Sequence, residues 1–268
     1  MRAFQVIFIL VLGTEYWLRA VPRWDQLSEA YFWHLGIAFM LCIAALSVRL
    51  RRPAFAALAL AHTVLVAREF PATGNHAYLE IVLCALGAVL DPTIPAERTL
   101  YLRAARALVL IVFFWSGVQK LVNGYWTNGL YLAFALRTPS YRAVLWPLVP
   151  AVELERLASL GIEVGSGPYT PAAPTLVAVS NATWMFEIAL APLLAWRRTR
   201  VVATLGAIAL VAAIEVGARE VFFGLVFLDG LLLFLPPAVQ RGAVVGVALA
   251  LALLALVRLG ILPEATFY

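Results

Sequence analysis

Apolar segments about as long as a bilayer is thick recur along almost the whole of this 268-residue chain. A helix that crosses the hydrocarbon core of a membrane needs about 20 residues. Hydrophobic residues make up 63% of the sequence and charged residues 13%, and a water-soluble domain of this length cannot hide so much apolar surface. The sequence therefore predicts an all-α, polytopic integral membrane helix bundle. It excludes a cytosolic enzyme, a disordered chain and a disulfide scaffold.

The hydropathy pattern predicts eight or nine transmembrane helices. The segment 123–174 interrupts this pattern, because prolines, glycines and interfacial aromatic residues collect there. We interpret residues 1–268 as a single transmembrane domain in which 123–174 forms an extracytoplasmic cap with one or two interfacial helices. The candidate spans lie at about 3–20, 31–49, 54–69, 77–91, 103–122, 175–196, 200–217, 219–236 and 241–262.

Arginine clusters between the predicted spans indicate the orientation of the chain. Arginine-rich loops favour the cytoplasmic side of a membrane, so the N-terminus is predicted inside and the 123–174 segment outside. The same arginines account for the net charge of +5, and we therefore expect the lipid bilayer, and no nucleic acid, as a partner. The clusters are Arg49, Arg51 and Arg52; Arg98, Arg103 and Arg106; and Arg197, Arg198 and Arg200.

Ionisable residues inside spans are costly and are the first candidates for function. Lys120 is the only lysine in the chain and lies near the end of a predicted span, where it could simply extend to the headgroups. The neighbouring Ser116 and Gly117 favour a closely packed helix face instead. Glu187 lies within another span and needs a buried partner, as a structural hydrogen bond or as part of a site.

A second candidate group lies at the start of the 77–91 span. His76 and Glu80 are four residues apart, so they share a helix face, and Asn75 could cap that helix. The alternatives are a capping turn with an interfacial histidine and a histidine oriented by a carboxylate. We interpret Glu215 and Arg219 as a local ion pair, and the other two histidines, His34 and His62, as packing residues.

Two segments give the chain a resemblance to a known family. The run Phe114-Trp115-Ser116-Gly117-Val118-Gln119-Lys120-Leu121, followed by Trp126 and Gly129, resembles the core of the vitamin K-dependent gamma-glutamyl carboxylases and of the related bacterial horizontally transferred transmembrane (HTTM) family. Residues 75–79, Asn-His-Ala-Tyr-Leu, resemble that family's Asn-His-Ser-Tyr-Leu segment. The likeness extends loosely from the second span to about residue 236. It implies a multi-pass protein of a bacterial inner (plasma) membrane.

The resemblance also implies a mechanism. In the family, a deprotonated lysine removes a proton from a reduced quinone, oxygen adds, and the strong base that results enables carboxylation of a peptide glutamate, assisted by a histidine. Carried over, Lys120 is the catalytic base and His76 the assisting acid, with a reduced vitamin K-like quinone as cofactor and no metal. A peptide or protein would bind at the extracytoplasmic face. The expected substrate-binding residues are Asn75, Tyr78, Glu80, Trp115, Ser116, Trp126, Glu187, Glu215 and Arg219.

These expectations have testable consequences and one rival. Lys120 and His76 should lie in one cavity, and Lys120→Ala should abolish quinol oxidation while leaving the bundle folded. The rival is a non-catalytic membrane subunit or maturation factor that binds a partner protein through the same bundle. The eukaryotic carboxylases carry a large lumenal domain, for which this chain has no room, and that difference favours the rival. The lack of internal repeats argues against a transporter.

Overall fold

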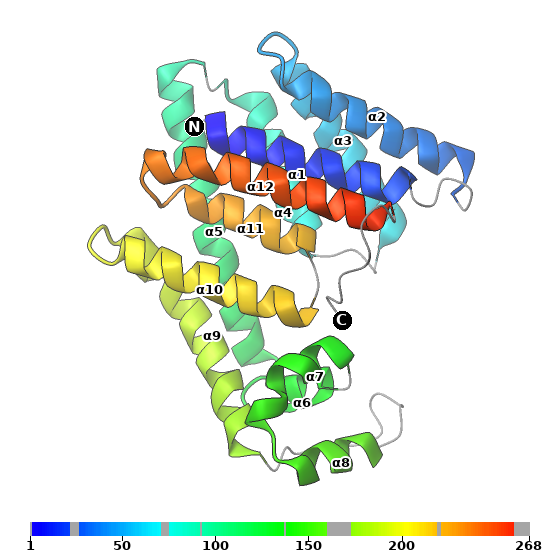
Figure 1. The fold of residues 1–268 in the computed structure, drawn as a ribbon. Helices are drawn as coiled ribbons and strands as arrows, with labels where there is room; N and C mark the ends of the chain where they lie inside the picture. The colour runs from blue at the N-terminus through cyan, green and yellow to red at the C-terminus, as the bar shows by residue number, and fades with distance from the viewer. Residues whose placement is uncertain are drawn as a thin grey trace. The chain divides into compact units, whose positions relative to one another are not determined.

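The computed structural model describes residues 2–21, 27–70, 75–91, 93–136, 138–159, 173–218 and 221–259, and within these ranges it contains helices and no strand (Figure 1). The prediction of an all-α chain is confirmed. Each predicted span corresponds to one helix. These helices are α1 (Arg2–Ala20), α2 (Glu29–Ala45), α3 (Arg51–Glu69), α4 (Asn75–Val89), α5 (Pro95–Val122), α9 (Pro174–Ala195), α10 (Arg200–Ala218), α11 (Val221–Leu232) and α12 (Pro237–Arg258).

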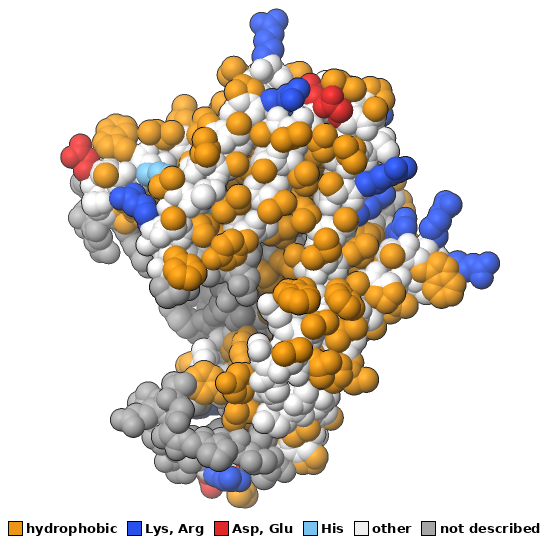
Figure 2. Space-filling model, turned by 180° about the vertical axis from the view of Figure 1, so that it is seen from behind, with side chains coloured by type: hydrophobic (Ala, Val, Ile, Leu, Met, Phe, Trp, Pro, Cys, Tyr) orange, Lys and Arg blue, Asp and Glu red, His pale blue; other side chains and the backbone are white. Residues whose placement is uncertain are grey.

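Several of these helices are suited to a membrane. Among the described residues, five helices are long and apolar enough to cross one: α1, α5, α9, α10 and α12. The shorter α2, α4 and α11 are also apolar over 10–17 residues. Many large hydrophobic side chains lie exposed on the surface, and orange side chains are spread widely over the face shown in Figure 2. In water such a surface would cause association, whereas in lipid it is the expected exterior.

The chain divides into two compact units that share the long helix α5. Unit 1 contains α1 to α4, α5 as far as Leu108, α11 and α12. Helix α1 packs against α2, α11 and α12, and α3 packs against both α2 and α4. Most of the predicted span 3–20 is accordingly buried by protein, and α1 is the most buried of the five candidate spans.

Unit 2 contains α5 from Val109 onward, the short helices and α9 and α10. The segment predicted as a cap holds three short α-helices and one 3₁₀ turn among its described residues. Helix α6 packs against α9 and α7 against α10, and the Ser140 hydroxyl donates to the Gly217 carbonyl at 2.6 Å. The short elements are α6 (Leu130–Ala135), α7 (Pro139–Leu145), η2 (Trp146–Leu148) and α8 (Ala151–Ser159).

Arginines near the loops donate hydrogen bonds to the carbonyl groups at the carboxyl ends of helices. The last carbonyls of a helix have no partner within it, and the positively charged fork of arginine satisfies them well. Arg52 donates to the two final carbonyls of α4, and Arg200 to carbonyls at the end of α9. Arg106 uses two of its nitrogens on the Leu233 carbonyl, directly after α11, at 3.0 and 2.7 Å. These bonds give a structural reason for the preference for arginine over lysine.

Candidate functional site

Lys120 forms an ion pair with Glu187 inside unit 2. Its Nζ lies 2.6 and 2.7 Å from the two carboxylate oxygens of Glu187 on α9 and 2.8 Å from the Ser116 hydroxyl one turn back on α5. The side chain of Glu187 is 4% exposed and that of Lys120 18%. The structure thus brings together three residues that the sequence analysis selected separately, and it gives Glu187 the buried partner that its position required.

A glycine allows the two helices of the pair to meet. A Cβ atom at Gly117 would lie 2.8 Å from the Trp184 carbonyl oxygen and 2.9 Å from the Ile188 backbone nitrogen, both on α9. Only a residue without a side chain permits this approach of α5 and α9. The predicted close packing at Ser116 and Gly117 is confirmed. Because Gly117 lies one turn from Lys120, the same contact sets the distance to Glu187.

Helix α9 also fixes the turn that follows α5. The Ser180 hydroxyl donates to the Trp126 carbonyl at 2.5 Å, and the Asn181 amide donates to the Thr127 carbonyl at 2.9 Å. The turn holds the Trp126 ring 5.0 Å from the Lys120 Nζ, where the ring face attracts the ammonium group. Lys120 is therefore surrounded by a carboxylate, a hydroxyl and an aromatic ring, and this group of four residues is called the Lys120 site below.

The remaining predicted site residues do not all join this group. Trp115 is 56% exposed on α5, and Tyr78 is 46% exposed on α4 of unit 1. Glu215 is half-buried on α10. The side chains of Asn75, His76 and Arg219 fall outside the described part of the chain, so the predicted pairing of Lys120 with His76 and that of Glu215 with Arg219 stay predictions.

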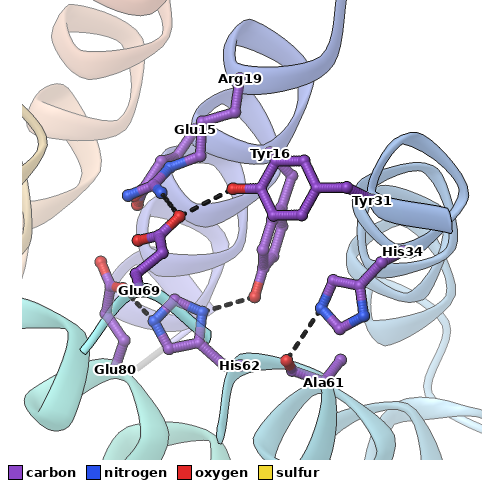
Figure 3. A network of polar contacts seen from close by, with 9 residues as sticks. All are labelled: Glu15, Tyr16, Arg19, Tyr31, His34, Ala61, His62, Glu69 and Glu80. Carbon is purple, nitrogen blue, oxygen red and sulfur yellow. Dashed lines mark hydrogen bonds and ion pairs between the residues drawn. The ribbon is translucent and has the colours of Figure 1, made fainter. Parts of the chain in front are cut away.

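Unit 1 contains a second polar cluster, which the sequence analysis missed (Figure 3). Arg19 bridges two carboxylates, at 2.6 Å to Glu15 on its own helix and 2.7 Å to Glu69 on α3. The Tyr31 hydroxyl on α2 donates to the same Glu69 oxygen at 2.7 Å. Glu15 is buried, whereas Arg19 and Glu69 retain about a third of their side-chain exposure (33% and 28%). The cluster thus joins three helices and opens at one end of the unit.

Tyr16, His62 and Glu80 form a fully buried line next to this cluster. The Tyr16 hydroxyl lies 2.6 Å from His62 Nδ1, and His62 Nε2 lies 2.8 Å from a Glu80 carboxylate oxygen. Dashed lines in Figure 3 trace this line from α1 through α3 to α4. None of the three side chains is more than 1% exposed. Glu80 was expected to act with His76, and the structure gives it a partner from another helix.

The prediction for the histidines is correct for one and incomplete for the other. His34 Nε2 lies 3.0 Å from the Ala61 carbonyl oxygen, which suits a satisfied packing residue. His62 is buried as predicted, but both of its ring nitrogens have polar partners on other helices. One sequence signal was available: Glu15 and Arg19 stand four residues apart in a span, which marks a polar face on an apolar helix.

Within the described residues, no group of three or more histidine, cysteine or acidic side chains has the arrangement of a metal site. Comparison with known proteins finds no matching family model, no matching curated protein and no matching solved structure. The resemblance to the carboxylase-like family therefore rests on the two sequence segments, and the function has to be argued from the side chains themselves.

Proposed function

We propose that the chain is a membrane-embedded, carboxylase-like enzyme that acts on a lipid-soluble quinol, with the Lys120 site as its proton-transfer centre. The observation that carries this proposal is an amine and a carboxylate 2.6 Å apart on two helices that are each apolar enough to cross a membrane. Such groups are expensive within a bilayer, and substrate sites or proton paths are the usual reason for their presence.

The chemistry of the pair suits a hydroxyaromatic substrate. The Glu187 carboxylate, 2.6 Å from the Lys120 Nζ, is placed to accept a proton from it and so to free the amine. In that form the Lys120 amine can accept the proton of a quinol hydroxyl. Dioxygen then takes two electrons from the quinolate and, with the proton held by Lys120 and the second hydroxyl proton, becomes hydrogen peroxide, which leaves the quinone. Trp126 lies beside the amine and stacks on Tyr131 at 4.4 Å between ring centroids, so an aromatic wall borders the Lys120 site.

The variant Lys120→Arg tests whether Lys120 acts as a base or only as the positive partner of Glu187. A guanidinium group keeps the positive charge opposite Glu187, but it stays protonated and cannot serve as a base. We expect oxygen-dependent quinol consumption by the purified protein to fall about 100-fold or more in this variant. Val122→Ala is the matched control, since Val122 is 76% exposed near the end of the same helix. Incorporation of labelled carbon dioxide into a glutamate peptide, measured alongside, tests the coupling that the family resemblance implies.

Two results would count against this proposal. Full activity in Lys120→Arg would mean that a positive charge suffices and that Lys120 is not the base. A wild-type protein that consumes no quinol would favour the rival function, a subunit or maturation factor that binds a partner protein.

The proposal includes the predicted arrangement in the membrane. We place eight or nine helices across the bilayer, with the N-terminus in the cytoplasm and the 123–174 segment outside as a cap. Arginines bond to the carboxyl-terminal ends of α4, α11 and α9. In this arrangement those three helices run inward, so their ends and the bonded arginines lie on the cytoplasmic side, where arginine-rich loops are favoured.

Cysteine labelling in intact cells tests the orientation. Val152→Cys, at a position 76% exposed on α8, should react with a membrane-impermeant maleimide before the cells are ruptured. Arg198→Cys, in the turn before α10, should react only afterwards. The native Cys42 and Cys84 are buried and provide a low background. The reverse labelling pattern would invert the orientation.

A further inference from the structure

We propose that Tyr16, His62 and Glu80 form a buried proton relay, which loads a proton onto Glu80 by a switch between the two neutral forms of His62. This inference concerns unit 1 and does not depend on the function of the Lys120 site. It is carried by an uninterrupted line of three groups that can each give and receive a proton, with contacts of 2.6 and 2.8 Å and almost no exposure.

The geometry defines the unloaded state of the relay. When Glu80 is ionised, it can only accept a hydrogen bond, so His62 must carry its proton on Nε2. His62 Nδ1 is then an acceptor, and the Tyr16 hydroxyl donates to it. In this state the Tyr16–His62 hydrogen bond joins a donor to an acceptor, and the ion-pair contact holds Nε2 2.8 Å from a Glu80 carboxylate oxygen.

The loaded state keeps the same two contacts, since His62 Nε2 and the Glu80 carboxylate oxygen are already 2.8 Å apart. A protonated Glu80 donates to Nε2, so the proton of His62 must move to Nδ1. The Tyr16 hydroxyl, which can donate or accept, then accepts the Nδ1 proton. The imidazole stays neutral in both states, as burial favours. Adding a proton to the relay thus removes the negative charge from the buried carboxylate without creating another charge.

A partly exposed carboxylate of the neighbouring cluster lies on the same helix as His62. Glu69 and His62 are seven residues apart on α3, so both lie on one helix face, and Glu69 is partly exposed beside Arg19. Figure 3 shows Glu69 and the His62 ring in one group. Among the described residues, the titratable and charged groups near the relay include Glu15 and Arg19 on α1, Cys42 on α2, Glu69 on α3 and Cys84 on α4. Tyr31 on α2 bonds to Glu69.

Nitrogen NMR of the full chain in lipid nanodiscs, with histidine labelled with ¹⁵N, tests the relay directly. The chain has three histidines, and His34→Gln and His76→Gln assign the His62 signals. Acidification from about pH 9 to about pH 6 should move the His62 proton from Nε2 to Nδ1 without forming an imidazolium. His34→Gln should leave that switch unchanged.

Two variants identify the partners. Glu80→Gln cannot take up a proton, so we expect one His62 form throughout the titration. Tyr16→Phe keeps the ring beside His62 but removes the acceptor for Nδ1–H, so the Nε2–H form should persist to lower pH. The relay is wrong if wild-type His62 keeps one form or becomes an imidazolium, or if the switch survives Glu80→Gln. Because the wild-type titration alone can contradict the relay, a variant that fails to fold does not remove the test.

Discussion

Gly117→Leu is expected to separate α5 from α9 and to destroy the Lys120 site. A Cβ atom at position 117 would meet backbone atoms of α9 at 2.8 and 2.9 Å, and backbone cannot rotate out of the way as a side chain can. Overpacking typically costs about 1–3 kcal/mol even where side chains can adjust, and we expect a loss at the upper end of that range or beyond it. Thermal unfolding of the purified protein in detergent, followed by tryptophan fluorescence, measures the effect.

The chain provides a matched control for this substitution. Gly246 on α12 has open space where its Cβ would lie, so Gly246→Leu adds the same side chain to a helix without a collision. We expect it to unfold at the wild-type temperature or slightly above, because leucine has a higher helix propensity than glycine. Equal stability of Gly117→Leu and Gly246→Leu would show that α5 and α9 do not meet at Gly117.

The Lys120 site shows what sequence reasoning could find. A single lysine, a serine four residues before it and a glycine between them are local signals, and each has a direct physical meaning in an apolar helix. Glu187 could be recognised as a residue in need of a partner. The pairing itself could not be predicted, because 67 residues separate Glu187 from Lys120 and hydropathy does not specify which helices are neighbours.

Local sequence signals could not predict the relay in unit 1 either, because they do not specify which helices are neighbours. Tyr16, His62 and Glu80 come from three helices, and Tyr16 and His62 look ordinary in their own segments. His62 in particular lies between apolar residues and satisfies every expectation for a packed histidine. The i,i+4 rule pointed from Glu80 to His76 on the same helix, whereas the close contact of Glu80 with His62 runs to α3. Tertiary pairing thus decides the role of these groups.

The arrangement of the segment 123–174 was predicted only in outline. Its prolines and glycines correctly indicated a break in the pattern of long helices, since proline ends helices and glycine permits turns. Gly124 and Gly129 both adopt positive φ angles, of 72° and 74°. The short helices α6 and α7 pack against α9 and α10 respectively, and such contacts leave no periodic signal in a short segment.

The last prediction concerns the stability that the Lys120–Glu187 pair provides. From the sequence alone, Lys120→Ala is expected to leave the bundle folded. The structure changes that expectation, because the variant would leave the carboxylate of Glu187, 4% exposed, without its ammonium partner. Removing one member of a buried pair typically costs about 3–5 kcal/mol. We therefore expect Lys120→Ala to unfold well below the wild-type temperature, and Glu187→Ala to do the same.

A double substitution shows whether the alanine variants lose stability because a buried charge is left unpaired or because packing is lost. Lys120→Met with Glu187→Leu removes both charges and keeps apolar volume, and replacing a buried ion pair in this way is often neutral or stabilising. We expect the double variant to recover most of the stability lost by either alanine variant, yet to lack quinol oxidation. Thermal unfolding in detergent supplies the first readout and oxygen-dependent quinol consumption the second. A double variant as unstable as the single ones would mean that shape, not charge, holds α5 and α9 together. If it instead kept full activity, Lys120 and Glu187 would have no part in proton transfer.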